Sequence, residues 1–256
     1  SAYPTPLQTI RQVVEYVDEN PDSLGVLAVE NSIEGTVRES LDNLMVTKNP
    51  NIKILAEYFM PISHCLLART TEFSSITGVI SHPQALAQCQ DFIHNELPFN
   101  VNIIEAPSTA EAARSLQNYN LTYGAIGSKK TAETYNLNVL KEGINDDKTN
   151  QTRFILIGDF ETEETGNDKT SMAFSTENKP GALLNVLEVF MENHINSYIA
   201  SRPSKHKFGE YIFIVNFDGH IHDPKIMHTI QQIKEKTTYI RFFGSYKKSK
   251  AIVLQP

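Results

Sequence analysis

Short apolar runs that alternate with helix-like segments constrain the fold of this chain more than any other feature. Runs typical of buried strands lie at 25–29, 78–80, 101–104, 124–126 and 154–157. Apolar residues at helical spacing lie between them, at 7–16, 37–45, 85–93 and 110–116. This alternation indicates an α/β fold with a largely parallel sheet. We expect two lobes, with the chain crossing near 58–68 and returning near 141–152.

The pattern changes after a polar, acidic linker at 159–168. Strand-like segments then lie at 170–175, 197–201, 210–217 and 239–245, and helix-like segments at 181–190 and 224–233. The resulting βαββαβ order predicts a small ferredoxin-like domain. Many functions occur on that topology, so the order alone predicts none of them.

Composition excludes several classes of protein. The chain has 256 residues, 40% of them hydrophobic and 21% charged, as in ordinary globular domains. Its net charge of -7, without a Lys/Arg-rich run, argues against nucleic-acid binding. No apolar run is long enough to cross a membrane, and no signal-peptide pattern opens the sequence. Cys65 and Cys89 lack metal-ligand spacing, so we expect reduced, buried thiols in a cytoplasmic protein without a metal.

Polar residues follow the first buried strand, in the segment VENSIEGT at 29–36. A helix N-terminus at this point would offer free N–H groups to an anion. The alternative is that Ser32 merely caps the next helix. The residues alone favour the cap.

Polar turns recur at other predicted strand ends. His82 and Gln84 follow the second strand, where His82 is an acid–base group, a carboxylate binder or a turn residue. Ser108 and Thr109 form a third turn. In the fourth, Arg153 either clamps a carboxylate bidentately or pairs with an acidic turn residue. Together the turns predict a site for a small, oxygen-rich anion.

In the C-terminal region, Pro180 and Gly181 open a helix, and the segment 201–203 ends the strand that follows. Glycine permits a close backbone approach, so a ligand or a second subunit can press against this turn. The alternative is a tight turn that joins strand to helix.

These motifs, in this order, resemble the prephenate dehydratase family over essentially the whole chain. The motifs are VENSIEG (29–35), SHPQALAQC (81–89), STAEAA (108–113), AIGS (125–128) and NQTRF (150–154), followed by GALL (181–184) and a variant of ESRP (200–203). The resemblance implies a two-lobed, periplasmic-binding-protein-like catalytic domain at 1–160, with its second lobe at about 62–145. It also implies a ferredoxin-like ACT regulatory domain at 168–256.

The function implied is the decarboxylating dehydration of prephenate to phenylpyruvate in L-phenylalanine biosynthesis. Such a carbon–oxygen lyase needs no cofactor, because aromatisation of the ring drives the reaction. The resemblance also implies L-phenylalanine as allosteric effector and a homodimer or homotetramer assembled through both domains. Alternatives are an arogenate dehydratase, a non-catalytic amino-acid-binding regulator and a degenerate regulatory paralogue.

The resemblance also assigns residues. Thr152 would be the catalytic hydroxyl, a hydrogen-bond donor to the leaving group. Glu34 would be a proton relay if burial keeps it protonated. The expected substrate-binding residues are Asn31, Ser32, Gly35, His82, Gln84, Ser108, Thr109, Arg153 and Phe154. The expected phenylalanine-binding residues are Asn178, Pro180, Gly181, Ala182, Leu183, Leu184, Ser201, Arg202 and Pro203.

Two departures from the family pattern bear on these expectations. The family normally opens with a strand and a Gly-rich motif, and this sequence starts with what usually follows them. A lobe lacking a strand would expose an unpaired sheet edge, so we expect the sequence as given to be incomplete there. Ala200 replaces the glutamate of ESRP, which leaves the strength of phenylalanine control open.

Overall fold

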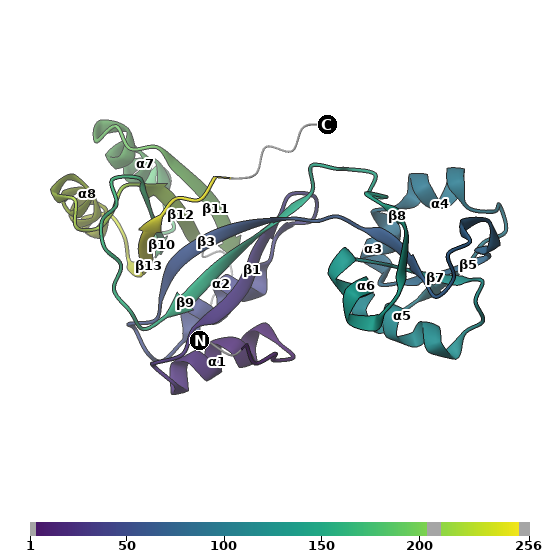
Figure 1. Ribbon diagram of the computed structural model, residues 1–256. Coiled ribbons are helices and arrows are strands. Elements are labelled where there is room, and N and C mark those ends of the chain that lie inside the picture. The colour runs from purple at the N-terminus through teal and green to yellow at the C-terminus, as the bar shows by residue number, and fades with distance from the viewer. Residues whose placement is uncertain (1–3, 204–210, 251–256) are drawn as a thin grey trace. The chain divides into compact units, whose positions relative to one another are not determined.

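The computed structural model describes residues 4–203 and 211–250. The chain forms two compact units (Figure 1). The first unit combines the residues up to Met60 with those from Thr152 onward, and the second spans Pro61–Gln151. The C-terminal βαββαβ segment therefore belongs to the same unit as the N-terminal lobe.

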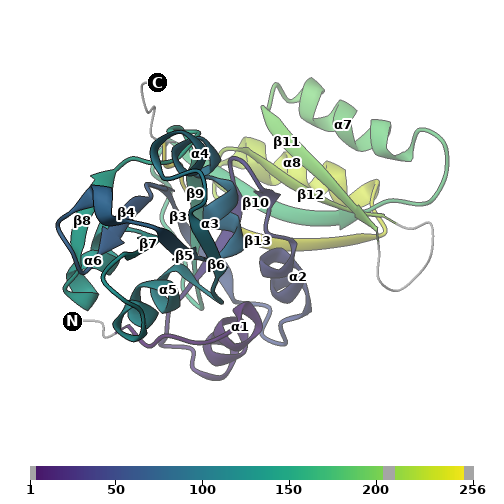
Figure 2. The same ribbon diagram turned by 90° about the vertical axis from the view of Figure 1, so that its right-hand side faces the viewer.

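The second unit is a five-stranded sheet between helices. Its strands, in the order β6-β5-β7-β4-β8, are β4 (Cys65–Ala68), β5 (Gly78–Ser81), β6 (Asn102–Glu105), β7 (Tyr123–Gly127) and β8 (Asn138–Glu142). One face packs on α3 (Pro83–Ala87) and α4 (Gln90–Glu96), and the other on α5 (Thr109–Ser115) and α6 (Lys129–Tyr135). Figure 2 faces this unit, with α4 above its strands and α5 below them. Short 3₁₀ turns lie at Phe73–Ser75 and Leu116–Asn118.

The N-terminal lobe of the first unit is a four-stranded sheet with two helices. Its strands, in the order β2-β1-β9-β3, are β1 (Gly25–Asn31), β2 (Gly35–Thr36), β3 (Lys53–Pro61) and β9 (Gln151–Gly158). The helices are α1 (Ile10–Glu19) and α2 (Arg38–Val46). A capping box between Thr9 and Gln12 starts α1, and Val14 and Val17 bury its apolar face in the lobe's core.

The expectation of a largely parallel sheet is correct only at the centre of the second unit. There β5 pairs in parallel with β6 and β7, which helices connect. Strand β4 is antiparallel to both β7 and β8. In the N-terminal lobe β1 is antiparallel to both β2 and β9, because β2 follows through a tight hairpin and β9 returns from the second unit.

The C-terminal segment has the predicted βαββαβ order. Its elements are β10 (Asp168–Ser175), α7 (Ala182–Glu192), β11 (Ser197–Pro203), β12 (Tyr211–Asp218), α8 (Pro224–Glu235) and β13 (Tyr239–Lys247). The strands form an antiparallel sheet in the order β11-β12-β10-β13. Helices α7 and α8 cover one face. The other face packs into the core of the N-terminal lobe through Ala173, Ile214, Phe243 and Tyr246 (Figure 1).

Gly244 lets this sheet approach the N-terminal lobe closely. Its φ of +139° lies outside the range that L side chains adopt readily. A Cβ atom at this position would lie 2.4 Å from the backbone oxygen of Ile54 on β3. The glycine is therefore required by both conformation and space, and the two backbones meet here with no room for an added atom.

Candidate functional site

The end of β1 meets the start of β9 and brings two predicted site residues together. The antiparallel register pairs Asn31 with Thr152 and Glu30 with Arg153. Asn31 Nδ2 donates a hydrogen bond of 2.9 Å to Thr152 Oγ1. Because the threonine oxygen accepts this bond, its own proton can be donated elsewhere. The contact joins the VENSIEG and NQTRF motifs at a polar, buried asparagine.

The turn after β1 is a hairpin built by Asn31. The side-chain oxygen Oδ1 accepts hydrogen bonds from the backbone N–H groups of Ile33, at 3.0 Å, and Glu34, at 3.1 Å. Gly35, with φ of +80°, closes the turn and starts β2. Helix α2 begins only at Arg38, so the predicted capping role of Ser32 is wrong. The N–H groups of Ile33 and Glu34 already have Asn31 as acceptor, and no helix begins within residues 32–35.

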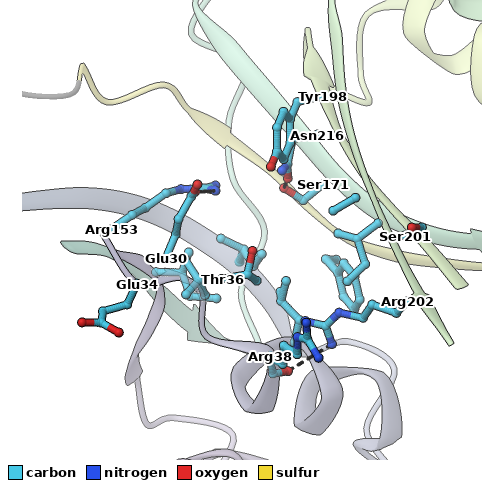
Figure 3. Close-up of a pocket in the computed structure, with 17 residues that line it drawn as sticks. Glu30, Glu34, Thr36, Arg38, Arg153, Ser171, Tyr198, Ser201, Arg202 and Asn216 are labelled. Atoms are coloured by element: carbon cyan, nitrogen blue, oxygen red, sulfur yellow. Dashed lines mark hydrogen bonds and ion pairs between the residues drawn. The ribbon is translucent and has the colours of Figure 1, made fainter. Parts of the chain in front are cut away.

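Glu34 does not meet the condition on which its predicted role depends. The residue is exposed, and its carboxylate points away from the neighbouring cavity in Figure 3. The structure therefore lacks the burial on which the predicted relay depends. Ser32 and Gly35 are exposed beside it, whereas Phe154 is half-buried and pairs with Ala28 across the β1–β9 ladder.

Arg153 points to the opposite face of β9 from Thr152, because successive side chains of a strand alternate. Its Nε donates to Glu57 Oε2 at 2.8 Å, and its Nη2 donates to the Tyr246 hydroxyl at 3.1 Å. Glu30 Oε2 lies 3.8 Å from Nη1. Burial opposes the charge, but Tyr246 and Glu57 together raise the pKa of Arg153. Of the two roles that the sequence left open, the structure therefore contains the ion pair, with Glu57 as its main partner.

A cavity of about 260 Å³ lies beside this cluster, between the N-terminal lobe and the C-terminal sheet (Figure 3). Its polar lining comes from Glu30, Glu34, Thr36, Arg38, Arg153, Ser171, Tyr198, Ser201, Arg202 and Asn216. Asn31 and Thr152 are not among the lining residues. The cavity and the Asn31–Thr152 pair are therefore separate features of the first unit.

In the second unit, the predicted residues gather at one edge of the sheet. Strands β5 and β6 end side by side, and the backbone N–H of Ala106 donates to Ser81 O at 2.8 Å. His82 Nδ1 accepts from the Gln84 N–H at 3.2 Å, and Ser108 Oγ accepts from the Glu111 N–H at 3.0 Å. Both side chains cap helices, a role that the sequence analysis did not assign to them. Gln84 is exposed and Thr109 half-exposed at the same edge.

The predicted phenylalanine-binding residues lie at one end of the C-terminal sheet. Phe174 and Ser201 both pair with Phe213, so Ser201 and the turn that follows β10 lie at the same end. Gly181 precedes α7 with φ of +81°, and a Cβ atom added there would meet no heavy atom within 4 Å beyond the adjoining residues. The glycine is needed for conformation rather than for close approach. Leu183 packs into the core, whereas Leu184 is 57% exposed.

Arg202 points away from Ser201, its neighbour on β11. Its Nη1 donates to Arg38 O at 3.0 Å and pairs with the Asp42 carboxylate, both on α2. The residue is 8% exposed. The structure thus gives Arg202 a contact with the N-terminal lobe, on the opposite face of the sheet from α7.

The sequence did not predict Glu57, the main ion-pair partner of Arg153, or the two other residues that contact this pair. Glu57, Lys169 and Tyr246 come from β3, β10 and β13, and none belongs to a motif. The available signal was Glu57 itself, because a single acidic residue within an apolar strand needs a buried cation.

The described residues contain no helix long and apolar enough to cross a membrane. Within the same residues, His, Cys, Asp and Glu side chains form no group of three or more that could hold a metal ion.

Comparison with known proteins identifies a family for this chain. Residues 1–162 match the family model of prephenate dehydratase. The chain is 43% identical to a prephenate dehydratase of Methanocaldococcus jannaschii, over 93% of this chain and 85% of that protein. It is 39% identical to a bifunctional chorismate mutase/prephenate dehydratase of Aquifex aeolicus, over 97% of this chain and 68% of that protein.

A solved structure of a prephenate dehydratase from Arthrobacter aurescens, in complex with L-Phe, has a TM-score of 0.85 at 32% identity, covering 98% of this chain and 84% of its own. A quorum-quenching acylase, GqqA, also has a TM-score of 0.85, but its 24% identity, over 96% of this chain and 89% of its own, shows a likeness of fold alone. By its family model and its relatives, the chain belongs to the prephenate dehydratase family.

Proposed function

We propose that this chain converts prephenate to phenylpyruvate, with Thr152 as the hydrogen-bond donor to the leaving hydroxyl. The observation that carries the assignment is the 2.9 Å hydrogen bond from Asn31 Nδ2 to Thr152 Oγ1. It links two motifs that lie 121 residues apart. It also orients a hydroxyl so that its proton is available to a third group.

The chemistry needs one donor at the departing oxygen. As the ring carboxylate leaves as carbon dioxide, the electron pair of its C–C bond enters the ring and the C–O bond of the ring hydroxyl breaks. The leaving hydroxide takes up a proton and departs as water. A threonine is a weak acid, so its contribution is a hydrogen bond that strengthens as negative charge develops on this oxygen.

The hydrogen bond that Asn31 donates to Thr152 makes the threonine hydroxyl a better donor to the leaving group. Hydrogen bonds in a chain polarise one another, so a hydroxyl that accepts a bond becomes a stronger donor. The bond also fixes the side-chain rotamer, which lowers the entropy lost when the substrate binds. Asn31 therefore acts as a positioning residue for Thr152.

The substrate site that we propose also includes the polar strand ends of the second unit. Substrate oxygens would be held there by His82, Gln84, Ser108 and Thr109. His82 and Ser108, which also cap helices, would use the polar atoms or protons that the cap hydrogen bonds do not occupy. The chain would work in the cytoplasm.

We propose further that the C-terminal segment is an ACT domain that binds L-phenylalanine. The supporting features are the glycine turn at 178–184 and Ser201, which share one end of the sheet. On α7, Leu184, Leu187 and Met191 are 57%, 37% and 66% exposed, which favours a homodimer or homotetramer that covers them.

The proposal is tested by assaying the purified chain for phenylpyruvate formation from prephenate and for phenylalanine formation from arogenate. We expect turnover of prephenate, with a kcat/KM at least about tenfold higher than for arogenate, the difference that some 1.4 kcal/mol of transition-state binding produces. If the chain forms phenylalanine from arogenate but no phenylpyruvate from prephenate, arogenate is the substrate. No turnover of either would support the non-catalytic regulator instead.

A further inference from the structure

Glu57 lies at the junction between the proposed catalytic strand and the C-terminal segment. Its side chain is completely buried, with 0% exposure. The carboxylate accepts from Arg153 Nε at 2.8 Å and from Lys169 Nζ at 2.9 and 3.0 Å. The backbone N–H of Ser249 donates to the same carboxylate at 3.1 Å. One buried anion therefore holds a cation from β9 and another from β10.

This arrangement makes Glu57 sensitive to both partners. An isolated buried carboxylate costs several kcal/mol, and removal of one partner from a buried ion pair typically costs about 3–5 kcal/mol. Burial, together with the nearby Arg153 charge, lowers the pKa of Lys169, so this lysine is also held there against a desolvation cost. A displacement of Lys169 would therefore change how the carboxylate binds Arg153.

Arg153 connects this anion to Thr152. The two residues are adjacent on β9, and the rung that pairs Arg153 with Glu30 follows the rung that pairs Thr152 with Asn31. The Arg153 side chain is 12% exposed and is held by Glu57, Tyr246 and Glu30. A guanidinium fixed on several sides leaves its backbone little freedom, so the Thr152 backbone follows the position of Arg153.

The C-terminal sheet also contacts Arg153 through the Tyr246 hydroxyl, in addition to the Lys169–Glu57 ion pair. The Tyr246 hydroxyl lies 2.7 Å from Ser171 Oγ, which in turn lies 2.5 Å from Asn216 Oδ1. Lys169 and Ser171 share one face of β10, Asn216 lies on β12 and Tyr246 on β13. Three of the four strands of this sheet therefore contact the cluster.

We infer that Glu57 is a positioning residue that transmits the state of the C-terminal segment to Thr152. The inference deepens the proposed function, on which the roles of Thr152 and phenylalanine rest. In the active state, Lys169 and Arg153 hold the carboxylate so that Thr152 meets Asn31. An effector bound at the end of the C-terminal sheet stabilises a second arrangement in which β10 moves Lys169, and Glu57 then shifts Arg153 and the strand that carries Thr152. Such a change requires only that phenylalanine binds the second arrangement better.

The test is Lys169→Met, which removes the ion pair between β10 and Glu57 but leaves the Glu57–Arg153 pair and the contacts of Tyr246 and Ser249. The matched control is Lys248→Met, because Lys248 pairs with Asp218 inside the C-terminal segment. For each variant, kcat and KM for prephenate are measured with and without saturating L-phenylalanine, and the Kd of phenylalanine is measured by titration calorimetry. Lys169→Arg, which keeps the charge, provides the rescue, and Lys169→Gln replaces the Met variant if that one does not fold.

We expect phenylalanine to inhibit the unmodified chain and the control by a factor in the range of about 5–150 that is usual for allosteric coupling. In Lys169→Met the factor should fall to about one or two while phenylalanine still binds, and Lys169→Arg should restore most of it. A residue with a purely structural role would change Tm or Kd without separating binding from inhibition. Full inhibition of Lys169→Met, or no inhibition of an active unmodified chain, would overturn the inference.

Hydrogen exchange separates this inference from the proposed function. We expect phenylalanine to change amide exchange in β9 around Thr152 in the unmodified chain and not in Lys169→Met. This measurement does not depend on turnover. If the chain is inactive on prephenate but shows the exchange difference, the proposed reaction is wrong and the coupling through Glu57 still holds. Equal changes in both proteins, or no change in either, would exclude Glu57 as the connection.

Discussion

Asn31 uses both ends of its amide at once. Its Nδ2 donates to Thr152 Oγ1, while its Oδ1 accepts from the N–H groups of Ile33 and Glu34. The acceptor end builds the local turn, and the donor end reaches across to β9. A substitution that separates the two ends can therefore distinguish a role in folding from a role in orienting Thr152.

Asn31→Asp is that substitution. A carboxylate still accepts from Ile33 and Glu34 but cannot donate, so the Thr152 hydroxyl would turn its proton toward the new acceptor. We expect kcat for prephenate to fall by about tenfold to 10²-fold, at the lower end of what a positioned proton donor contributes. The Tm should change little, because the turn keeps its acceptors. Steady-state kinetics and calorimetry measure the two effects.

The control for this prediction is Asn31→Ala, which removes both ends. It should lower kcat similarly and also lower stability by about 0.5–1.5 kcal/mol, because the partly buried N–H groups of Ile33 and Glu34 lose their acceptor. A fully active Asn31→Asp variant would mean that the contact with Thr152 has no part in catalysis.

Cys89 is shielded from solvent in the core of the second unit. Burial raises its pKa to about 12, with smaller contributions from Asp146 and Cys65. At pH 8 only about one thiol in 10⁴ would then be ionised, and the thiolate is the reactive form. We expect native protein to react negligibly with a thiol reagent at pH 8, and unfolded protein to reveal both cysteines. Rapid modification of native protein would contradict the burial of both thiols, which the structure describes as free and buried.

At the scale of elements, β10 begins at a carboxylate that organises the turn before it. Asp168 accepts from the backbone N–H of Thr165 at 2.7 Å, from Thr165 Oγ1 at 2.6 Å and from the N–H of Gly166 at 3.0 Å. Burial acts to raise its pKa, but these hydrogen bonds outweigh burial, and the pKa lies below the ordinary value of 3.8. Ionised Asp168 therefore stabilises the entry to the C-terminal segment.

The sign of the pH dependence follows from this lowered pKa. The stabilisation is fully present above the unfolded value near pH 4 and is lost as pH falls through the folded value below 3.8. We expect Asp168→Asn to lower the free energy of unfolding by about 1–3 kcal/mol at pH 7. The difference from the unmodified chain, measured by denaturant unfolding, should shrink as pH falls through this folded value.

Asp147 offers a matched control for Asp168. It accepts from Thr149 in the same local pattern, at 2.7 Å from the N–H and 2.6 Å from Oγ1, but on an exposed turn. Water replaces lost hydrogen bonds there, so Asp147→Asn should cost less than about 0.5 kcal/mol. Equal effects of the two substitutions would show that burial at Asp168 adds nothing.

The sequence predicted many elements that have a clear apolar pattern, but it missed β4, whose four residues are all buried, and elements without such a pattern. Helix α6 was missed because only Ala132 of its residues is buried, which leaves no helical stripe. Strand β3 was missed because its buried and exposed positions do not alternate regularly and because it continues into the crossing between lobes. The direction of strand pairing was also beyond the pattern, since β9 resembles a parallel strand in sequence but runs antiparallel to β1.

For the molecule as a whole, the sequence predicted which motifs matter but not how they connect. Asn31, Thr152 and Arg153 all lie in predicted motifs, and their contacts depend on the register of β1 and β9. Glu57 and Lys169 meet across 112 positions of the chain, and no local pattern encodes such a pairing. The exposure of Glu34 was not predicted for the same reason, because burial is set by tertiary packing rather than by its neighbours in sequence.

The first unit therefore joins the proposed chemistry and its proposed control. The C-terminal sheet has α7 and α8 on one face and the N-terminal lobe on the other, and Gly244 and Glu57 mark the contact. Residues of this contact can change regulation without touching substrate. Thr152, by contrast, should affect the reaction directly.

The most direct test compares Thr152→Val with Thr152→Ser in phenylpyruvate formation from prephenate. Valine keeps the shape of threonine and removes the hydroxyl, whereas serine keeps the hydroxyl. We expect kcat of Thr152→Val to fall by about 10²-fold or more while KM changes much less, as for the loss of a transition-state donor. Thr152→Ser should retain kcat within about tenfold. A Thr152→Val variant with the kcat of the unmodified chain would contradict the assignment of Thr152 as the donor to the leaving hydroxyl.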